Sequence, residues 1–475
     1  MKKQTINKII FLIPIIIFGT LLMSAFTINH LSWLERVPYY EKRVIFTTYF
    51  YWYHQNQSSL LDSSHMIEKW TIEDIYKVGN KTLPPNWPGP TNPYDMVVGE
   101  FHDALTYHMP AAEPSYDEYG EVNSTLQTGI MENITDWVSY NNTAYHEWEI
   151  RGMIKAGIDV LMPVYWYNGL EHKWSLDGLY KIVETRKQLI PKIIAEANAK
   201  EPGINHTEQY ADRIIPKIAM FFDTTCMKGL WALLESNGNC SLYEELFWNG
   251  TGPDLNEPYW QEQFWLRIKD FYSIVDSESA FEFNGNYVVW LYGANWFADV
   301  GTKVLDYCKQ KFKQEFGKDL LFVGPKGWLK ANVDGVCNWG ACCPGDIIPP
   351  QYNKIPVGAV SPGFYNLGAI KFQGPAFYNR DPEKYKELWR NLINQNPTWI
   401  HVETWNEFHE GTNICWTQEF GYTFINVTRE MADIFHQLGN TPSPHYIDLY
   451  NLIIPLSILG LILIPQLIII KRKNI

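Results

Sequence analysis

The sequence predicts a (β/α)8 TIM-like barrel with a long insertion near the N-terminus, flanked by two transmembrane helices. Short runs rich in Val, Ile and aromatic residues alternate with amphipathic helical patterns, which is typical of a parallel sheet covered by helices. Two long apolar segments lie near the ends of the 475-residue chain and leave about 410 residues between them. That length suits a barrel that carries insertions.

The two apolar segments, residues 9–28 and 449–470, can each cross a hydrocarbon core of about 30 Å as a helix. Basic residues flank their outer ends: Lys2, Lys3, Lys8, Lys471, Arg472 and Lys473. By the positive-inside rule both termini lie in the cytoplasm, and the main domain, residues 35–448, lies on the extracellular or luminal side of the membrane. A signal peptide cleaved near Ser24 and Ala25 is the alternative for the first segment, although that segment is longer than a usual signal core.

N-glycosylation sequons agree with this topology. All nine lie between the apolar segments: Asn56, Asn80, Asn123, Asn133, Asn141, Asn205, Asn239, Asn249 and Asn426. A sequon is used only outside the cytosol, so this distribution favours an extracytoplasmic domain.

Composition excludes several classes of protein. Charged residues make up 19% of the chain and aromatic residues 15%, which excludes a disordered chain or a coiled coil. Residues 35–448 hold 33 basic and 52 acidic residues, a net charge of −19, whereas a general nucleic-acid binder needs a basic surface. The surplus of aromatic rings favours flat, neutral ligands, of which sugars are the first candidates.

The seven cysteines do not form a metal-binding pattern. They are Cys226, Cys240, Cys308, Cys337, Cys342, Cys343 and Cys415. Outside the cytosol, Cys226 with Cys240, and Cys337 with Cys342 or Cys343, are candidate local disulfides. No CxxC, HExxH or clustered Cys/His spacing occurs, so we expect neither a metal nor a cofactor.

Seven segments are predicted as buried parallel strands: residues 44–50, 158–165, 217–222, 287–292, 320–323, 355–361 and 399–405. A weaker eighth strand is expected within residues 95–130. Residues 55–145 are rich in turn residues and hold five of the sequons, which predicts an insertion. An open doubly wound sheet is the alternative, but no glycine-rich phosphate loop follows any predicted strand.

Helical periodicity fills the intervals between the strands. Apolar residues recur at helical spacing in residues 147–156, 176–197 and 259–275. Gly157 follows the first of these as a C-cap, and Asp381 with Pro382 predicts the start of a further helix.

Candidate catalytic residues follow the last predicted strand. In a barrel, catalytic groups project from the carboxyl ends of the strands. Strand alternation places four side chains on one face: His401, Glu403, Trp405 and Glu407. Glu407 and Glu410 form a pair of carboxylates among aromatic residues, as glycosidic cleavage requires, because one protonates the leaving oxygen and the other acts as base or nucleophile. Burial against Trp405 and Phe408 would raise the pKa of a carboxyl group.

Aromatic residues gather at the ends of other predicted strands, in residues 49–53, 165–167 and 291–296. Aromatic faces stack on the apolar faces of sugar rings, and neighbouring amide and hydroxyl groups bind sugar hydroxyls. The predicted substrate-binding residues are Tyr49, Trp52, Tyr165, Trp166, Tyr292, Trp405, Asn406 and His409. For any one aromatic residue, packing in the core is the alternative.

The segment 405–412, Trp-Asn-Glu-Phe-His-Glu-Gly-Thr, closely resembles the Phe-Asn-Glu-Trp-His-Glu-Gly-Thr signature of the endo-α-mannosidase/endo-α-mannanase glycoside hydrolases, family 99, and their uncharacterised relatives. Residues 49–53 are similar to the first strand of that family, residues 146–166 to its His…Ala-Gly-Ile-Gly segment, and Tyr292 to a tyrosine at a strand end. Phe408 replaces a Trp of the signature, Glu403 a small polar residue, and Gly293 an Asp. These differences leave the carboxylate pair intact and bear on the substrate.

The resemblance implies a metal-independent (β/α)8 enzyme that cleaves internal α-mannosidic bonds with retention. In that family a glutamate deprotonates the 2-hydroxyl of the sugar, which forms a 1,2-anhydro intermediate, and a second glutamate acts on the leaving oxygen. Carried over by position, Glu407 would be the base at O2 and Glu410 the general acid/base. A glycan or oligosaccharide would be the substrate.

The sequence therefore leaves three candidate functions. The first is a membrane-anchored glycoside hydrolase that acts on glycans outside the cytosol. The second is a non-catalytic glycan-binding or surface-structural membrane protein on the same fold, because a barrel can keep its cleft without turnover. The third, a membrane-bound glycosyltransferase, lacks a nucleotide-binding signal.

Overall fold

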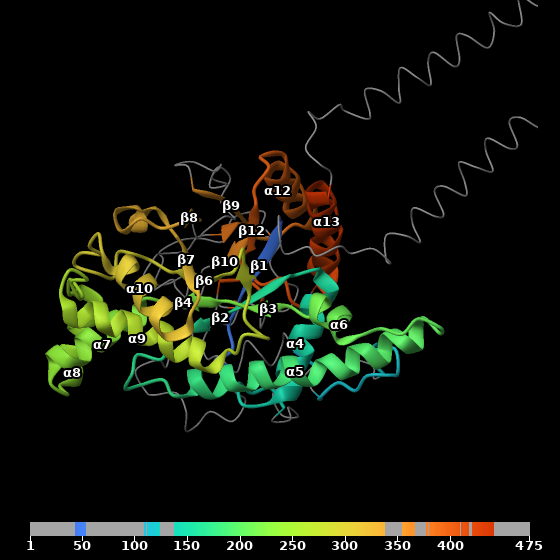
Figure 1. The fold of residues 1–475 in the computed structure, drawn as a ribbon, viewed down its shortest axis with the longest axis horizontal. Helices are drawn as coiled ribbons and strands as arrows, with labels where there is room; N and C mark the ends of the chain where they lie inside the picture. Colours follow the sequence, from blue (N-terminus) through green and yellow to red (C-terminus); the bar gives the residue numbers. More distant parts are fainter. Residues whose placement is uncertain are drawn as a thin grey trace, which may run out of the picture.

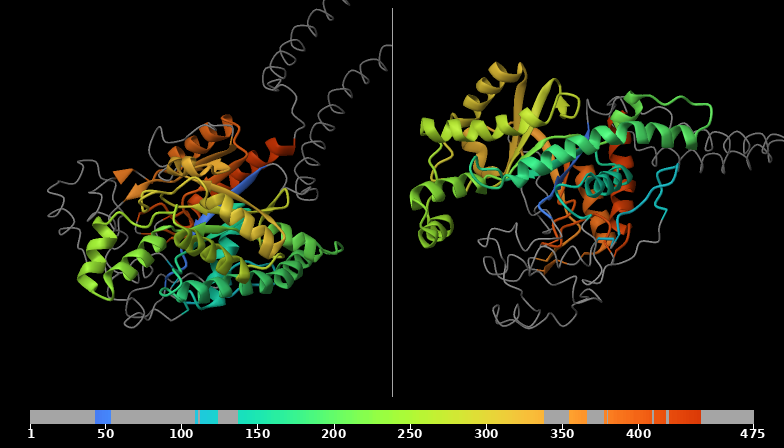
Figure 2. Two further views of the ribbon diagram at one scale, coloured as in Figure 1. Left: turned by 60° about the vertical axis from the view of Figure 1, so that its left-hand side comes forward. Right: turned by 90° about the horizontal axis from the view of Figure 1, so that it is seen from below.

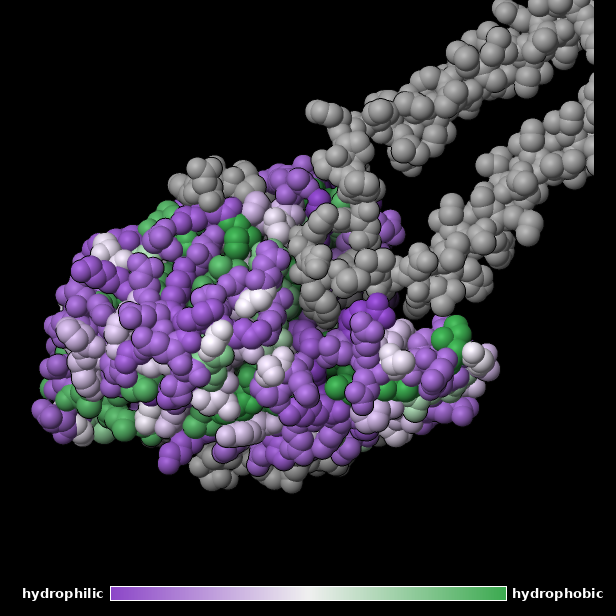
Figure 3. Space-filling view, viewed as in Figure 1, coloured by the Kyte–Doolittle hydropathy of each residue, from purple (hydrophilic) through white to green (hydrophobic). Residues whose placement is uncertain are grey.

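The computed structural model describes residues 43–53, 109–110, 112–123, 137–337, 354–365, 377–378, 380–408, 410–417 and 420–440. Both predicted transmembrane segments and His409 lie outside these residues. Among the helices that are described, none is long and apolar enough to cross a membrane. Hydrophilic residues predominate on the face of the molecule seen in Figure 3.

A closed barrel of parallel strands forms the centre of the molecule (Figure 1). In barrel order its strands are β1 (Val44–Tyr49), β2 (Val160–Tyr165), β3 with β4 (Lys217–Ile218 and Met220–Phe222), β6 (Asn286–Leu291), β7 (Asp319–Gly324), β8 (Gly335–Val336), β9 (Ile355–Val360) and β12 (Trp399–Val402). The last strand pairs with the first, so that Thr47 lies opposite both Leu161 and Val402. The predicted fold class is confirmed for the barrel.

The eighth strand was predicted in the wrong place. It is β8, between β7 and β9, and not a segment of residues 95–130. In the described part of that segment, Tyr116 and Val122 form an isolated antiparallel bridge rather than a strand of the barrel. A two-residue strand has too few residues to show a hydrophobic pattern, so the sequence could not reveal β8.

Helices cover the outside of the barrel (Figures 1 and 2). They are α4 (Thr143–Ala156), α5 (Trp174–Lys200), α6 (Glu208–Ile214), α7 (Thr225–Ser236), α8 (Cys240–Asn249), α9 (Pro258–Ile274), α10 (Val304–Phe316), the 3-10 helix η5 (Lys326–Ala331), α12 (Pro382–Asn394) and α13 (Thr423–Asn440). The long helix α5 crosses the barrel, with α7 and α8 toward one of its ends and α6 at the other. Short strands β5 (Glu282–Phe283), β10 (Phe364–Tyr365) and β11 (Phe377–Tyr378) complete the described elements.

The predicted helix ends are confirmed. Gly157 caps α4 with φ of 78°, a left-handed conformation that glycine adopts without strain. Asp381 caps α12 by accepting hydrogen bonds from the backbone N–H groups of Glu383 and Lys384, and Pro382 is the first helical residue. Because α4 begins at Thr143, the predicted insertion ends before residue 145.

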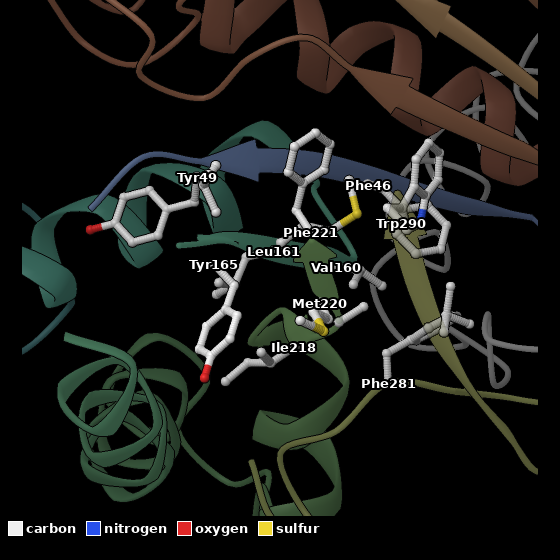
Figure 4. Packing of buried hydrophobic residues seen from close by; sticks show 14 of the residues in the cluster. Phe46, Tyr49, Val160, Leu161, Tyr165, Ile218, Met220, Phe221, Phe281 and Trp290 are labelled. Atoms are coloured by element: carbon white, nitrogen blue, oxygen red, sulfur yellow. The ribbon is translucent and has the colours of Figure 1, made fainter. Parts of the chain in front are cut away.

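Buried aromatic and aliphatic side chains pack together around the barrel strands (Figure 4). The Phe46 ring lies with its centroid 5.2 Å from those of Phe281 and Trp290 and 5.0 Å from that of Trp399. Each of these rings is at most 2% exposed. The strands therefore close around a packed core, which holds the carboxyl ends of the strands in fixed positions.

The predicted disulfide between Cys226 and Cys240 is wrong. Both residues are free thiols in the structure, and Cys226 is buried whereas Cys240 is exposed at the start of α8. The possible partners of Cys337, which are Cys342 and Cys343, lie outside the described residues.

Candidate active site at the carboxyl ends of the strands

The loop that carries the signature begins earlier than the sequence predicted. The strand β12 ends at Val402, so the alternation expected from His401 to Glu407 does not extend through the loop. Trp405 turns outward to α4, where its indole lies so close to Gly152 that a Cβ atom there would be 2.7 Å from the ring. Glu407 instead acts electrostatically on Tyr53, Asp223 and Tyr292. The prediction that Trp405 and Glu407 share a face is therefore wrong.

The Asn406 side chain fixes the loop to β1. Its Oδ1 accepts from the backbone N–H of Phe50 at 2.8 Å, and its Nδ2 donates to the Phe50 carbonyl at 2.7 Å. The Tyr53 hydroxyl donates to the Asn406 carbonyl at 2.7 Å. All three side chains are buried, so these bonds are protected from water and hold the start of the loop in one position.

Further hydrogen bonds hold the backbone around Glu407, the catalytic candidate, in place. The Glu407 N–H donates to Thr404 Oγ1 at 2.9 Å, and the Trp405 N–H donates to the Thr48 carbonyl at 2.8 Å. Thr404 and Thr412 close the loop, since the Thr404 N–H donates to the Thr412 carbonyl at 2.9 Å. The loop is thus tied at both of its ends and to the neighbouring strand.

The charges of four carboxylates act on the phenol of Tyr292, which follows β6. Burial raises the pKa of Tyr292 far above its usual range, and the charges of Glu410, Asp223, Glu403 and Glu407 raise it further, in that order. Glu407, Glu403 and Asp223 are buried, and Glu410 is half-buried. Two strands, β4 and β12, therefore bring their acidic groups toward the phenol that follows β6, as the barrel allows.

Asp223, directly after β4, is a member of this group that the sequence analysis missed. Burial raises its pKa to about 6, and the charge of Glu407 acts in the same direction. Bonds from Thr225 and from Trp166, whose Nε1 donates to Asp223 Oδ2 at 2.5 Å, oppose that rise. Its position at the carboxyl end of a strand is the signal that could have revealed it, because the same rule singled out Glu407.

Beneath the carboxylates lies a buried, neutral histidine. Burial lowers the pKa of His401 to about 3. Its Nε2 lies 2.7 Å from Thr48 Oγ1, and its Nδ1 lies 3.8 Å from Glu403 Oε1. His401 therefore supplies a hydrogen-bonding group below the site without adding positive charge at neutral pH.

Aromatic rings stand beside the carboxylates. Trp52 and Trp166 stack with their ring centroids 4.0 Å apart and their planes 11° from parallel. Both are half-buried, and Trp166 also donates to Asp223. The ring of Tyr53 lies 5.4 Å from that of Phe408 in the signature loop.

Four of the predicted substrate-binding residues are buried and support the site from behind: Tyr49, Tyr165, Trp405 and Asn406. The Tyr49 hydroxyl lies 2.8 Å from His146 Nδ1, and the Tyr165 ring packs edge-on against Phe271 of α9. Figure 4 shows the Tyr165 side chain directed toward the helical layer. Aromatic content alone does not distinguish these rings from Trp52, Trp166 and Tyr292, which lie at the mouth.

A family model described as "Domain of unknown function (DUF5010)" matches residues 112–449, well over half of the chain. The chain belongs to the DUF5010 family. A search of curated proteins finds no match for this DUF5010 member.

Solved structures similar to the DUF5010 chain include glycoside hydrolases. One is the GH99 endo-alpha-mannosidase from Bacteroides thetaiotaomicron, with 14% identity over 83% of this chain and 97% of that one, at a TM-score of 0.48. The same enzyme in complex with BIS-TRIS-propane gives a TM-score of 0.44 at the same identity and coverage. A structure described as "Glycoside hydrolase-like protein" gives 12% identity, coverage of 82% and 94%, and a TM-score of 0.48.

Proposed function

We propose that this protein is a membrane-anchored glycoside hydrolase that acts on glycans outside the cytosol. The observation that carries the proposal is the meeting of Glu410, Asp223, Glu403 and Glu407 around Tyr292, beside a stacked tryptophan pair, at the carboxyl ends of the barrel strands. Glycosidic cleavage needs a pair of carboxyl groups at the scissile bond, and Glu407 and Glu410 of the signature loop are the proposed pair.

Exposure supports different roles for the two glutamates. Glu410 is half-buried, and of the four carboxylates its charge raises the pKa of Tyr292 the most, which favours a position of its carboxyl group toward the mouth. Glu407 is only 4% exposed and lies closer to the core of the barrel. Glu410 can then reach the glycosidic oxygen of a bound sugar, and Glu407 can reach a hydroxyl on the same ring.

The proposed reaction follows the family whose signature residues 405–412 resemble. Glu410 donates its proton to the leaving oxygen while Glu407 takes the proton of the 2-hydroxyl, and O2 forms a bond to C1 as the glycosidic bond breaks. Water then opens the 1,2-anhydro sugar. Glu410 takes the proton of that water and Glu407 returns its proton to O2, which restores both groups and retains the configuration at C1.

The stacked tryptophans support recognition of a sugar. Trp52 and Trp166 present flat apolar faces next to the carboxylates, and pyranose rings stack on such faces. Tyr292 adds a hydroxyl that stays protonated because burial and the carboxylate charges raise its pKa, so it can donate to a sugar oxygen. These three residues are the proposed substrate contacts among the residues described.

Exposed sequons support the proposed location. Six of the nine sequons fall in the described residues, and every acceptor is exposed: Asn123, Asn141, Asn205, Asn239, Asn249 and Asn426. A glycan could be attached at each without disturbing the core.

Product release from α-mannosyl oligosaccharides and a wider glycan panel tests the proposal. The full chain is compared with Glu407→Gln and Glu410→Gln, which preserve shape and remove the charge. Release by the native chain that is lost in both variants supports the hydrolase. Binding of glycans without release, unchanged in both variants, would instead favour a glycan-binding protein on the same fold.

A further inference from the structure

The indole of Trp405, in the signature loop, is held at two points by one face of α4. Its Nε1 donates to Glu149 Oε2, and its six-membered ring lies against Gly152. Residues three apart in a helix lie on the same face, so Glu149 and Gly152 together form a socket for the indole, here called the α4 socket. Glu149 and Trp405 are each 1% exposed, so water does not compete for the hydrogen bond between them.

Glu149 is a costly residue to bury at this position. Burial raises its pKa to about 7, although hydrogen bonds from Trp405, Tyr145 and Asn406 oppose that rise. No lysine, arginine or histidine of the described part of the chain forms an ion pair with it. A buried carboxyl group without an ion pair destabilises the folded chain, and an apolar side chain of similar size would avoid that cost. Packing alone therefore does not account for an acidic residue here.

Gly152 breaks a second local rule at the same place. A glycine inside a helix destabilises the helix relative to alanine, yet Gly152 lies well inside α4. A Cβ atom at this position would be 2.7 Å from the Trp405 ring, so alanine does not fit unless the indole moves. The unfavourable choices at Glu149 and Gly152 are both explained by one requirement, which is that Trp405 occupies the socket.

The position of Trp405 determines the path of the signature loop. Its N–H donates to the Thr48 carbonyl at 2.8 Å, and its own carbonyl accepts from the Cys415 N–H at 2.9 Å. Trp405 therefore joins β1, the returning end of the loop and α4. Because Glu407 is only two residues further along the chain, a shift of the indole would displace it.

We propose that Glu149 is a positioning residue of the barrel mouth, which together with Gly152 holds the Trp405 indole and so fixes the places of Glu407 and Glu410. Glu149 acts through Trp405 and has no contact with substrate of its own. Its effect on catalysis rests on the proposed function, whereas its hold on the loop does not. A displacement of a catalytic group by about 1 Å lowers the rate by about 10²-fold, so the position of this loop matters.

Steady-state kinetics on the full chain test the effect on catalysis, with the α-mannosyl oligosaccharide or other panel glycan that the native chain cleaves. Glu149→Leu removes the acceptor and is expected to lower kcat by about 10–100-fold, with KM changed by less than about threefold, because the tryptophan pair that binds the sugar is left in place. Glu149→Gln keeps a carbonyl acceptor for the indole N–H and is expected to restore kcat to within about threefold of the native value.

Glu147→Leu is the matched control for Glu149→Leu. Glu147 lies on the same helix and forms ion pairs with Arg151 and Lys192, so its loss lowers stability without a change in the socket. With rates referred to the folded fraction, measured by circular dichroism, its kcat is expected to equal the native value. An equal fall of kcat in the two leucine variants would overturn the inference.

Gly152→Ala tests the socket from its other side. Alanine strengthens a helix, but its Cβ would displace the indole, so kcat is expected to fall by at least about tenfold. Gly229→Ala, inside α7, is the matched control, because a Cβ atom there would lie 3.6 and 3.8 Å from its nearest neighbours, an ordinary contact distance. A native kcat in Gly152→Ala would contradict the socket.

Amide hydrogen exchange measures the hold on the loop without any activity. In segment 403–408 the N–H groups of Thr404, Trp405 and Glu407 are all hydrogen-bonded. Glu149→Leu is expected to speed their exchange by at least about tenfold and to leave the exchange of α10 unchanged, whereas Glu147→Leu should act alike on both segments.

The exchange result separates this inference from the proposed function. If the native chain cleaves no glycan, the proposed function fails, and faster exchange in segment 403–408 still shows that Glu149 holds the loop. If the native chain cleaves a glycan but Glu149→Leu exchanges in this segment as the native chain does, the positioning role of Glu149 is wrong.

Discussion

The barrel mouth and a separate cavity of about 570 Å³, which lies along α4, differ in how their charged residues are arranged. At the mouth, four carboxylates act together on one phenol, and burial raises the pKa of Asp223 to about 6. Five acidic and five basic residues line the cavity, where Arg151 pairs with Glu196 and Lys200 with Glu121. Proton transfer needs titratable groups that remain available, whereas recognition alone allows charges to neutralise each other.

Removal of the mouth carboxylates is the test of this comparison with the largest expected effect. Glu407→Gln and Glu410→Gln are each expected to lower hydrolysis by about 10²–10⁴-fold, because each removes one proton-transfer group. The rate of product release measures the effect. Glu430→Gln on the outer helix α13 is the control, since Glu430 pairs with Lys386 and lies outside the mouth. Loss of activity in only one of the two mouth variants would contradict the paired mechanism.

The two regions meet at the loop that Asn406 secures. Asn406→Ala leaves the Phe50 N–H and carbonyl buried without their partner, which is expected to lower the free energy of unfolding by about 2–4 kcal/mol. Urea unfolding measures this change. Asn205→Ala, at an exposed position, serves as the control and is expected to change stability by less than about 0.5 kcal/mol.

The pH dependence of the unfolding free energy tests the comparison at Glu149, a residue of α4 that lines the cavity. Burial raises its pKa to about 7 from 4.5, so the stability that its protonated form contributes is complete below pH 4.5 and is lost as the pH rises through 7. Glu149→Gln stays neutral and avoids that loss. The unfolding free energy of the variant, relative to the native chain, is expected to rise by on the order of 3 kcal/mol from pH 4 to pH 8.

Glu147→Gln on the same helix is the matched control. Glu147 forms ion pairs with Arg151 and Lys192, so its substitution is expected to cost stability without a gain at pH 8. A difference between Glu149→Gln and the native chain that does not change with pH would show that folding does not raise the pKa of Glu149.

The smallest expected effect concerns the tryptophan pair. Trp166→Phe keeps an aromatic face but removes the Nε1 donor that lowers the pKa of Asp223, so that pKa is expected to rise above about 6. The pH profile of glycan binding should shift upward in its acidic limb. Trp52→Phe keeps the Asp223 bond and should leave the profile in place. Equal profiles for both variants would exclude Asp223 from the site.

The sequence alone determined the barrel, most strands and the capped helices, and it predicted the carboxylate pair. Strands of four to six residues, such as β1, β2 and β12, show a hydrophobic pattern that can be recognised in the sequence. Helix caps such as Asp381 depend only on neighbours two or three residues away in the chain. The acidic residues after the last strand stood out because barrels place their chemistry at strand ends.

Only the tertiary structure decided which aromatic rings face the mouth and which carboxylates join Glu407. Tyr49 and Trp52 lie three residues apart, yet one is buried against His146 and the other stacks on Trp166. Asp223 and Glu149 meet the signature loop across separations of more than 180 residues. Such contacts depend on how strands close and helices pack, and no local pattern in the chain records them.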